Sequence, residues 1–219
     1  PSLEIFIVDD KSSDRTLEKI YEVKKSFDDW EALTILEQKE NKGKATALNV
    51  ALQQVNSKYM LVIDADSYLS KDALSYLLAE LTSSSDIGAV TGRPIVRNRT
   101  TLLEKLQTLE YLSVIDAIKR AQSLFLGAIM TVSGVIVMYR VEALKEIGGF
   151  NTEVMTEDID VTWRLHRNQW KVKYVPKALS YILVPENLKS LLKQRKRWAV
   201  GGVEVLISNL TKVVIFLSE

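Results

Sequence analysis

The first 96 residues alternate between short apolar runs and longer amphipathic segments, and this alternation most restricts the fold. Apolar runs of strand length stand at residues 3–8, 32–38, 59–64 and 87–96. Between them, apolar residues recur at helical spacing in the segments 15–27, 45–55 and 71–82. Strands that are separated by helices are joined by crossover connections. We therefore predict an α/β fold with a mostly parallel central sheet flanked by helices.

The second half of the chain has a different pattern, which begins with one long helical segment. The expected elements are a helix at 101–126, a strand at 131–140, helices at 141–148 and 157–170, an extended segment at 172–183 and a helix at 186–206. No repeat, low-complexity tract or Pro/Gly linker divides the chain. Residues 1–219 are therefore predicted to form one domain with two halves, 1–93 and 94–219.

Composition excludes several classes of function. With 29 basic and 28 acidic residues the net charge is +1, which does not favour nucleic acid as a partner. The absence of cysteine rules out disulfides and thiolate metal sites. No apolar run reaches the roughly 18 residues of a membrane span. Because the chain starts almost directly in a strand and stops soon after an apolar run, we expect it to be a domain of a longer protein.

Acidic residues follow two of the predicted strands. Asp9 and Asp10 come after the first strand, and Asp64 and Asp66 form the sequence "DAD" after the third. Ligands of parallel α/β sheets bind beyond the carboxyl ends of the strands. Carboxylates there can hold a hard divalent cation that shares its coordination with a substrate diphosphate. The alternative is that these acids cap the following helices, a role that nearby serines could fill equally well.

Two basic motifs are further candidates. In "NKGKATALN", Gly43 permits a tight turn, and Lys42 and Lys44 lie at a helix start, where phosphate is favoured, although the Walker spacing is absent. In "QRKRW", the spacing of Gln194, Arg197 and Trp198 puts all three on one helical face. A guanidinium beside an indole suits phosphate and sugar binding. The alternative is a basic helix that lies on anionic lipid, and the two readings are compatible.

The segment "VMTEDIDVTW" places Glu157, Asp158 and Asp160 at the start of a predicted helix. Acidic residues in a first turn are stabilised by the helix dipole, and Thr156 is a suitable N-cap. Apolar positions on one face, namely Met155, Ile159, Trp163 and Trp170, also fit plain structure. The segment alone does not distinguish a helix end from a proton-transfer site.

Together, six short motifs resemble the family-2 glycosyltransferases, and in particular the processive, membrane-embedded synthases of cellulose, hyaluronan and poly-N-acetylglucosamine. In chain order they are "VDDKSSD", "NKGKATALN", "DAD", "VSG" at 132–134, "TED" at 156–158 and "QRKRW". The stretches "LQTLEY" and "VPENLKSLLKQRKRWAVGG" are most similar to the bacterial poly-β-1,6-N-acetylglucosamine synthases of biofilm matrix.

This resemblance implies a GT-A fold and inverting transfer from a UDP-sugar, with UDP-N-acetylglucosamine as the expected donor. Residues 1–93 would bind the nucleotide-sugar and a Mg²⁺ or Mn²⁺ ion, and residues 94–219 the acceptor. On the donor side, the resemblance implies Asp10 at the uridine and Lys44 near the nucleotide-sugar, with Asp64 and Asp66 at the diphosphate and metal and Asp66 as the direct ligand. It implies Asp158 as the general base, beside Glu157. Gln194, Arg197 and Trp198 would lie around the diphosphate and the acceptor sugar.

The resemblance also implies partners and a location. A growing polysaccharide would be the acceptor, and the catalytic domain would lie on the cytoplasmic side of the cell membrane, anchored by flanking helices. A small accessory membrane subunit is a further expected partner. The family's opening strand and membrane helices are not seen in this chain. Alternatives are a cellulose- or hyaluronan-type donor, a transferase that makes a single linkage, and a non-catalytic nucleotide-sugar or cyclic-dinucleotide binding module.

Overall fold

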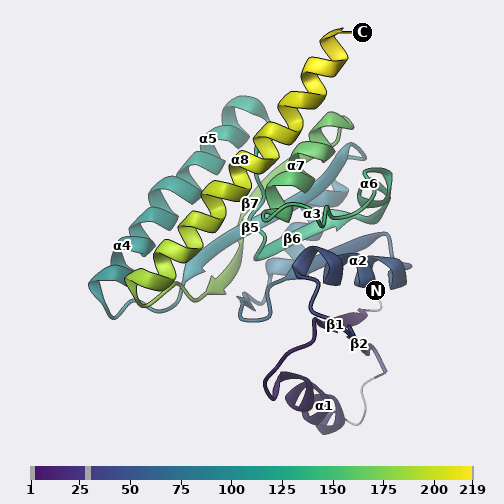
Figure 1. The fold of residues 1–219 in the computed structure, drawn as a ribbon, viewed down its shortest axis with the longest axis vertical. Helices are drawn as coiled ribbons and strands as arrows, with labels where there is room; N and C mark the ends of the chain where they lie inside the picture. Colours follow the sequence, from purple (N-terminus) through teal and green to yellow (C-terminus); the bar gives the residue numbers. More distant parts are fainter. Residues whose placement is uncertain (1–2, 28–30, 219) are drawn as a thin grey trace. The chain divides into compact units, whose positions relative to one another are not determined.

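The computed structural model describes residues 3–27 and 31–218, and side chains within this range up to residue 209. The chain forms two compact units. One holds the described residues up to Asn56 together with Gly149–Thr152, and the other holds Ser57–Gly148 and the described residues from Glu153 onward. Figure 1 shows the elements of each unit.

The first unit contains the predicted strand–helix–strand pattern. Its elements are β1 (Ile5–Asp9), α1 (Thr16–Ser26), β2 (Leu33–Glu37) and α2 (Lys44–Gln54). β1 and β2 pair in parallel, in a register that runs from Ile5 opposite Leu33 to Asp9 opposite Glu37. α2 packs against β1 and buries Ala45, Ala51 and Leu52. A short loop from the second half of the chain joins this unit, because the Asn49 side chain exchanges two hydrogen bonds with the backbone of Phe150.

The second unit is built on a five-stranded sheet with the order β3-β6-β5-β7-β4. The strands are β3 (Tyr59–Ile63), β4 (Tyr68–Leu69), β5 (Ile87–Val96), β6 (Ile136–Arg140) and β7 (Lys171–Ile182). Only β5 and β7 pair in parallel, whereas β3–β6, β5–β6 and β4–β7 are antiparallel. The prediction of a mostly parallel sheet is therefore wrong for this unit.

The physical reason is the insertion of one strand. β3 and β5 run in the same direction, as their crossover through α3 (Ala73–Thr82) requires, but they do not pair with each other. β6 enters between them in the opposite direction. α3 covers one face of the sheet and buries Ala73, Leu77 and Leu81 completely. β5 and β7 lie too close together at Gly92 for a side chain there, because an added Cβ would be 2.4 Å from the carbonyl oxygen of Ala178 in β7.

The predicted long helix at 101–126 is present but contains a π-helical turn. It consists of α4 (Leu102–Glu110), η1 (Tyr111–Asp116) and α5 (Ala117–Leu126). Thr101 and Glu104 form a capping box at its start. Backbone hydrogen bonding at Thr101, followed by bonds from Thr100 and Asn98, lowers the pKa of Glu104 to about 2. In this π-helical segment, the side chains of Tyr111 and Asp116 are buried in the protein interior.

Three more helices complete the second unit: α6 (Val141–Glu146), α7 (Glu157–Arg167) and α8 (Leu188–Ser218). α7 is shorter than predicted, because Gln169 adopts a left-handed φ of 63°. Trp170 therefore lies outside the helix. The prediction that it shares a helical face with Ile159 and Trp163 is wrong. Residues 131–134 precede β6 as a loop rather than as part of the strand.

α8 is longer than predicted, with 31 residues. Within residues 3–27 and 31–218, no helix combines the length and the apolar character that crossing a membrane requires. In Figure 1, α8 runs alongside the helical segment α4–η1–α5.

Candidate functional site

In the first unit, Asp10 organises the turn that precedes α2. Its Oδ1 accepts hydrogen bonds from Gln38 Nε2 at 2.7 Å and from the Lys42 backbone N–H at 2.8 Å. Its Oδ2 accepts the Gly43 N–H at 2.7 Å. Gly43 itself has a φ of 85°, which favours glycine because it lies in the left-handed region. The carboxylate at the end of β1 thus fixes the "NKGK" turn in place.

Lys44 is the first residue of α2 and its side chain is exposed. Because Asp10 binds the two residues before it, the predicted uridine residue and the predicted nucleotide-sugar residue are brought together in one local structure. The neighbouring Asp9 is buried, with Oδ2 accepting the Ser12 N–H at 3.2 Å. The N-terminus of α2, with the exposed Lys44 as its first residue, suits an anionic ligand.

In the second unit, "DAD" follows β3 as a tight turn. The Ser67 N–H donates to the Asp64 carbonyl at 2.9 Å, and the Asp64 N–H to the Val135 carbonyl at 3.5 Å. Asp66 is exposed. α3 begins only at Ala73, with Asp72 at its N-cap position, so neither predicted site residue caps this helix. The capping alternative for this motif is therefore wrong.

The chemistry of the turn fits a shared cation better than a site made by protein alone. No group of three or more His, Cys, Asp or Glu side chains is placed to hold a metal ion within the described part of the chain. Asp64 and Asp66 offer two hard oxygen ligands, and Mg²⁺ or Mn²⁺ usually completes such a pair with water and substrate phosphates. In the same turn, Ser67 Oγ is buried and has no hydrogen-bond partner among the described residues, which is consistent with a ligand that completes the site.

Asp158 lies in the first turn of α7 and both of its carboxylate oxygens accept backbone hydrogen bonds. Oδ1 accepts the Ile159 N–H at 2.9 Å, and Oδ2 accepts the Gly134 N–H of the "VSG" loop at 3.3 Å. A side chain at Gly134 would bring its Cβ to 3.2 Å from the same Oδ2. Glycine at this position therefore allows the loop backbone to approach the carboxylate.

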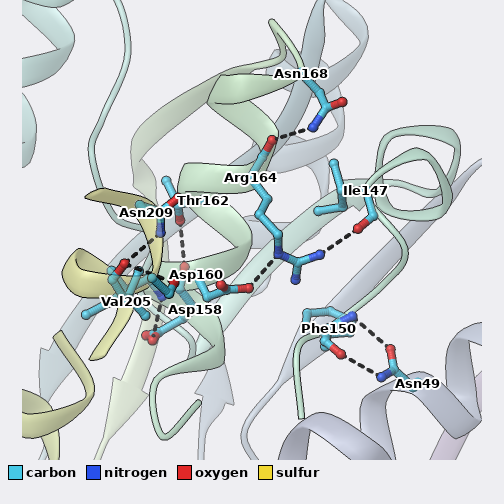
Figure 2. A network of polar contacts seen from close by, with 12 residues as sticks. Asn49, Ile147, Phe150, Asp158, Asp160, Thr162, Arg164, Asn168, Val205 and Asn209 are labelled. Atoms are coloured by element: carbon cyan, nitrogen blue, oxygen red, sulfur yellow. Dashed lines mark hydrogen bonds and ion pairs between the residues drawn. The ribbon is translucent and has the colours of Figure 1, made fainter. Parts of the chain in front are cut away.

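Polar contacts connect the residues of α7 after Asp158 with one another and with neighbouring loops, and Figure 2 shows several of them. Thr162 Oγ1 donates to the Asp158 carbonyl at 2.7 Å and accepts the Val132 N–H at 3.1 Å. Asp160 is buried and its Oδ2 pairs with Arg164 Nε at 2.5 Å, while Arg164 also donates to the Ile147 carbonyl. Asp160 thus has a structural role. Glu157, beside Asp158, is half-buried.

Thr156 occupies the N-cap position of α7, but its side chain makes no capping hydrogen bond, so the predicted cap is wrong. Its Oγ1 is buried without a hydrogen-bond partner. The reason is the packing of α8, because a Cβ at Gly201 would lie 2.5 Å from Thr156 Cγ2. Farther along α8, Glu204 accepts the Met155 N–H at 3.3 Å. α8 therefore lies directly on the "TED" segment.

The "QRKRW" motif forms one turn of α8, as predicted. Trp198 and Val135 both pack against an apolar cluster that contains Tyr111, and the Arg195 guanidinium lies 4.2 Å from the centre of the Trp198 ring. Arg195 also pairs with Glu110 of α4. Gln194 is half-buried and accepts a hydrogen bond from Arg195, while Arg197 is exposed.

The second unit thus brings together four of the sequence motifs. Gly134 contacts Asp158, and the next residue, Val135, contacts both Asp64 and the cluster around Trp198. Burial raises the pKa of Tyr111 to about 12, and the charges of Arg195, Glu110 and Asp64 also act on this phenol. The "DAD", "VSG", "TED" and "QRKRW" motifs are therefore parts of one constellation.

Several members of this constellation were not predicted from the sequence. Tyr111 and Arg195 support Trp198, and Lys119 of α5 donates a hydrogen bond from Nζ to Ser133 Oγ of the "VSG" loop. Burial lowers the pKa of Lys119 to about 8, whereas the charges of Asp158 and Asp116 act to raise it. The only sequence signal was a lysine on an otherwise amphipathic helix, and surface lysines share that pattern.

Comparisons with known proteins identify the family to which the chain belongs. Residues 1–201 match the family described as "Glycosyltransferase like family 2". The chain is 44% identical over 214 residues to a poly-β-1,6-N-acetyl-D-glucosamine synthase of Staphylococcus epidermidis, a match that covers 98% of this chain and 51% of the relative. The chain thus spans about half the length of this curated relative.

Solved structures agree on the fold. A mannosyltransferase of Pyrobaculum calidifontis, in complex with GDP-Man and Mn²⁺, has a TM-score of 0.75 and 25% identity, covering 95% of this chain and 55% of its own. TarS 1-349 of Staphylococcus aureus, in complex with UDP, has a TM-score of 0.59 and 23% identity, covering 83% of this chain and 51% of its own. The predicted GT-A architecture is confirmed by these likenesses.

Proposed function

The chain belongs to glycosyltransferase family 2, and we propose that it is the catalytic domain of a membrane synthase that transfers N-acetylglucosamine from UDP-N-acetylglucosamine to a growing β-linked polysaccharide with inversion. Its 44% identity to a poly-β-1,6-N-acetyl-D-glucosamine synthase supports this donor and product. The observation that carries the proposal is the position of Asp158, which is held by Gly134 and lies beside the helix that bears Trp198.

Asp158 would act as the general base. An inverting transfer needs a group that takes the proton from the acceptor hydroxyl as this oxygen attacks the anomeric carbon. The two backbone hydrogen bonds to its oxygens fix the plane of the carboxylate, which prepares it for one acceptor orientation. Glu157, as the neighbouring acid, would contact the substrate, and Asp160 would keep its structural role in the ion pair with Arg164.

Donor-binding roles are proposed separately for residues within each unit. In the first unit, Asp10 would contact the uridine and Lys44 would lie near the nucleotide-sugar, because Asp10 fixes the turn that leads into α2 at Lys44. Asp64 and Asp66 would hold the diphosphate through Mg²⁺ or Mn²⁺, with Asp66 as the direct ligand. Such a cation stabilises negative charge on a departing diphosphate.

The acceptor side would be formed by α8. Trp198 offers an aromatic surface for a sugar ring, and Gln194 and Arg197 would contact the diphosphate and the acceptor. Leu188 and Leu192 are exposed on the same helix beside exposed Lys189 and Lys193, a pattern that supports contact with a membrane surface. We place the domain on the cytoplasmic side of the cell membrane, where a small accessory membrane subunit would be a partner.

The test is product analysis with membranes that contain the full-length protein. Membranes are supplied with UDP-N-acetylglucosamine, with UDP-glucose, or with UDP-N-acetylglucosamine and UDP-glucuronic acid together, and the products are sized and their linkages determined. We expect high-molecular-weight β-linked polymer that contains N-acetylglucosamine alone, and only where UDP-N-acetylglucosamine is supplied. Polymer from UDP-glucose would assign the protein to a cellulose-type synthase, and polymer made only from the two donors together would assign it to a hyaluronan-type synthase. A single added sugar would indicate a non-processive enzyme, and binding of UDP without any transfer would indicate a non-catalytic module.

A further inference from the structure

Lys119 is a buried cation that the proposed reaction does not yet use. Its side chain is 6% exposed, and it is the only buried lysine or arginine among the side chains that the structure describes. A buried ammonium is costly unless charged and polar groups surround it. The position of Lys119 therefore calls for a physical reason.

The π-helical turn accounts for how Lys119 reaches the interior. η1 interrupts the helix just before α5; Asp116 at the end of η1 and Lys119 in the first turn of α5 are both buried. The Nζ atom lies 5.9 Å from the centre of the Tyr174 ring and donates its hydrogen bond to Ser133 Oγ. Single π-helical turns of this kind are frequent at functional sites.

Ser133 connects this ammonium group to the proposed base. Its backbone N–H is bound by Thr91 Oγ1 at 3.1 Å, and the next residue, Gly134, donates its N–H to Asp158. The loop is thus fixed by β5 through Thr91, by α5 through Lys119 and by α7 through Asp158. The charge of Asp158 also acts directly on Lys119.

The other nearby acid, Asp116, already has partners. Its carboxylate accepts Arg93 at 3.1 Å, Arg120 at 2.9 Å and the Tyr174 hydroxyl at 2.6 Å. Lys119 is therefore not needed to balance Asp116. Lys119 of α5 and Tyr139 of β6 are electrostatically coupled to Asp158. On α7 itself, Glu157 is the neighbouring acid, and Asp160 is paired with Arg164. The positive charge of Lys119 favours an ionised Asp158.

We propose that Lys119 is a positioning residue for the transfer reaction, which holds Ser133 so that Gly134 fixes Asp158 and whose positive charge stabilises the Asp158 carboxylate. This inference rests on the proposed role of Asp158 as general base. The acceptor itself need not touch Lys119, because the loop transmits its effect.

The test compares Lys119→Met, Lys119→Arg and Arg120→Met in membranes that contain the full-length protein. Arg120→Met is the matched control, because it removes the neighbouring cation on α5 and its bond to Asp116 but leaves Ser133 and Asp158 untouched. The rate of transfer is measured across the pH range in which the parent is active, and UDP binding is measured in parallel to verify the fold.

We expect Lys119→Met to lower kcat by roughly 10-fold or more and to move the acid limb of the pH profile upward by about one unit, because a nearby opposite charge favours the carboxylate. UDP affinity should stay within a few-fold. Lys119→Arg should restore the position of the acid limb, and Arg120→Met should match the parent.

A parent-like pH profile for Lys119→Met would overturn the inference. If Lys119→Met does not accumulate, Ser133→Ala replaces it, since this variant removes the hydrogen bond and keeps both charges. A lowered kcat with an unmoved acid limb would then support the positioning role, and a parent-like kcat would overturn it. The proposed base is tested separately by Asp158→Asn. An active Asp158→Asn refutes the base, whereas an inactive one beside a parent-like Lys119→Met refutes only the role of Lys119.

Discussion

Asp158 and Asp66 are both acidic residues of a proposed site, yet their surroundings differ in a way that separates their roles. Asp158 is half-buried and bound by two backbone N–H groups, whereas Asp66 is exposed on a turn. A fixed carboxylate suits proton transfer from one defined acceptor position, and an exposed one suits a cation that arrives with its own water and phosphate ligands. Substitutions at the two positions should therefore affect different steps.

Asp158→Asn should abolish transfer and leave UDP affinity within a few-fold. Asparagine keeps the size of the side chain and an oxygen for the Gly134 N–H, but it cannot accept the proton of the acceptor hydroxyl. Loss of a general base typically costs roughly 10²–10⁴-fold in rate. The check is the rate of sugar incorporation by membranes of the full-length variant, together with UDP binding. Near-normal synthesis would refute the assignment.

Asp66→Ala should weaken the UDP binding that depends on metal. The change removes a charged oxygen ligand of a hard cation, so Mn²⁺ should no longer strengthen the binding as it does in the parent. Calorimetry with UDP, with and without Mn²⁺, measures this difference. Asp72→Ala is the matched control, since Asp72 is another exposed aspartate close by that makes no capping hydrogen bond. Equal metal dependence in Asp66→Ala and in the control would place the cation elsewhere.

At the scale of elements, the contact between α8 and the start of α7 links the acceptor motif to the proposed base. Two consecutive glycines of α8 differ sharply in their surroundings. A Cβ at Gly201 would lie 2.5 Å from Thr156, but a Cβ at Gly202 would have only Ile159 Cδ1 within 4 Å, at 3.9 Å. The chain therefore offers two nearly identical substitutions with opposite expected effects.

Gly201→Ala should destabilise the domain by about 1–3 kcal/mol and reduce transfer, because the added methyl group forces α8 away from Thr156. Gly202→Ala should be neutral or stabilising by up to about 1 kcal/mol, since alanine favours the helix. The measurement is the rate of thermal inactivation of both full-length variants in membranes. Equal inactivation rates would show that the α7–α8 contact is not close.

Element positions could be predicted well, because hydrophobic periodicity is a local property of the sequence. The strand predicted at 87–96 has the same bounds as β5, and the first unit has the predicted parallel pair. The insertion of β6 between β3 and β5 could not be predicted, since the pairing partners of a strand depend on residues far apart in the chain. The π-helical turn in η1 was missed for a similar reason, because its sequence also fits an ordinary helix.

The candidate site was predictable in its motifs but not in its supports. The family and the fold that the motifs implied are confirmed, whereas the roles of the individual site residues stay predictions. Lys119 was missed, because its contact with Ser133 spans 14 residues and depends on the inward turn after η1. Thr156 was predicted to cap α7, yet α8, which starts more than 30 residues later, covers its side chain.

At the scale of the whole molecule, exposed apolar side chains on α8 are combined with cations. Leu192 is 66% exposed and lies beside exposed Lys193 and Lys196. A helix with this pattern binds anionic lipid through apolar groups in the acyl boundary and amines at the headgroups. The polypeptide of residues 1–219 should therefore bind anionic vesicles.

Leu192→Ser should weaken this binding several-fold, because it removes apolar area from the lipid contact. Val23→Ser is the matched control, since Val23 is 51% exposed on α1 of the first unit. Co-sedimentation with vesicles of phosphatidylglycerol, compared with neutral vesicles, measures the effect. Equal loss in both variants, or equal binding to neutral vesicles, would contradict a lipid contact centred on α8.

The same 219-residue polypeptide should make no long polymer. In the proposed full-length protein, membrane helices would hold the growing chain for the next addition, and no helix within residues 3–27 and 31–218 has the length and apolar character to replace them. We expect oligomers that are sensitive to detergent or salt, because exposed apolar side chains of α8 can associate. Size-exclusion fractions supplied with UDP-N-acetylglucosamine measure both properties. High-molecular-weight glycan from these fractions would refute the expectation.

The antiparallel insertion of β6 has a consequence for biosynthesis. β3 and β5 leave the ribosome before β6 at residues 136–140, and in the folded sheet each of them pairs with β6 rather than with the other. The nascent chain must therefore keep two apolar strands, whose edges lack partners, for the time that translation needs to add more than 40 residues after β5. Such edges are prone to aggregation. The sheet can be completed only after β6 and then β7 have been made. Its assembly is therefore a late event in the synthesis of the domain.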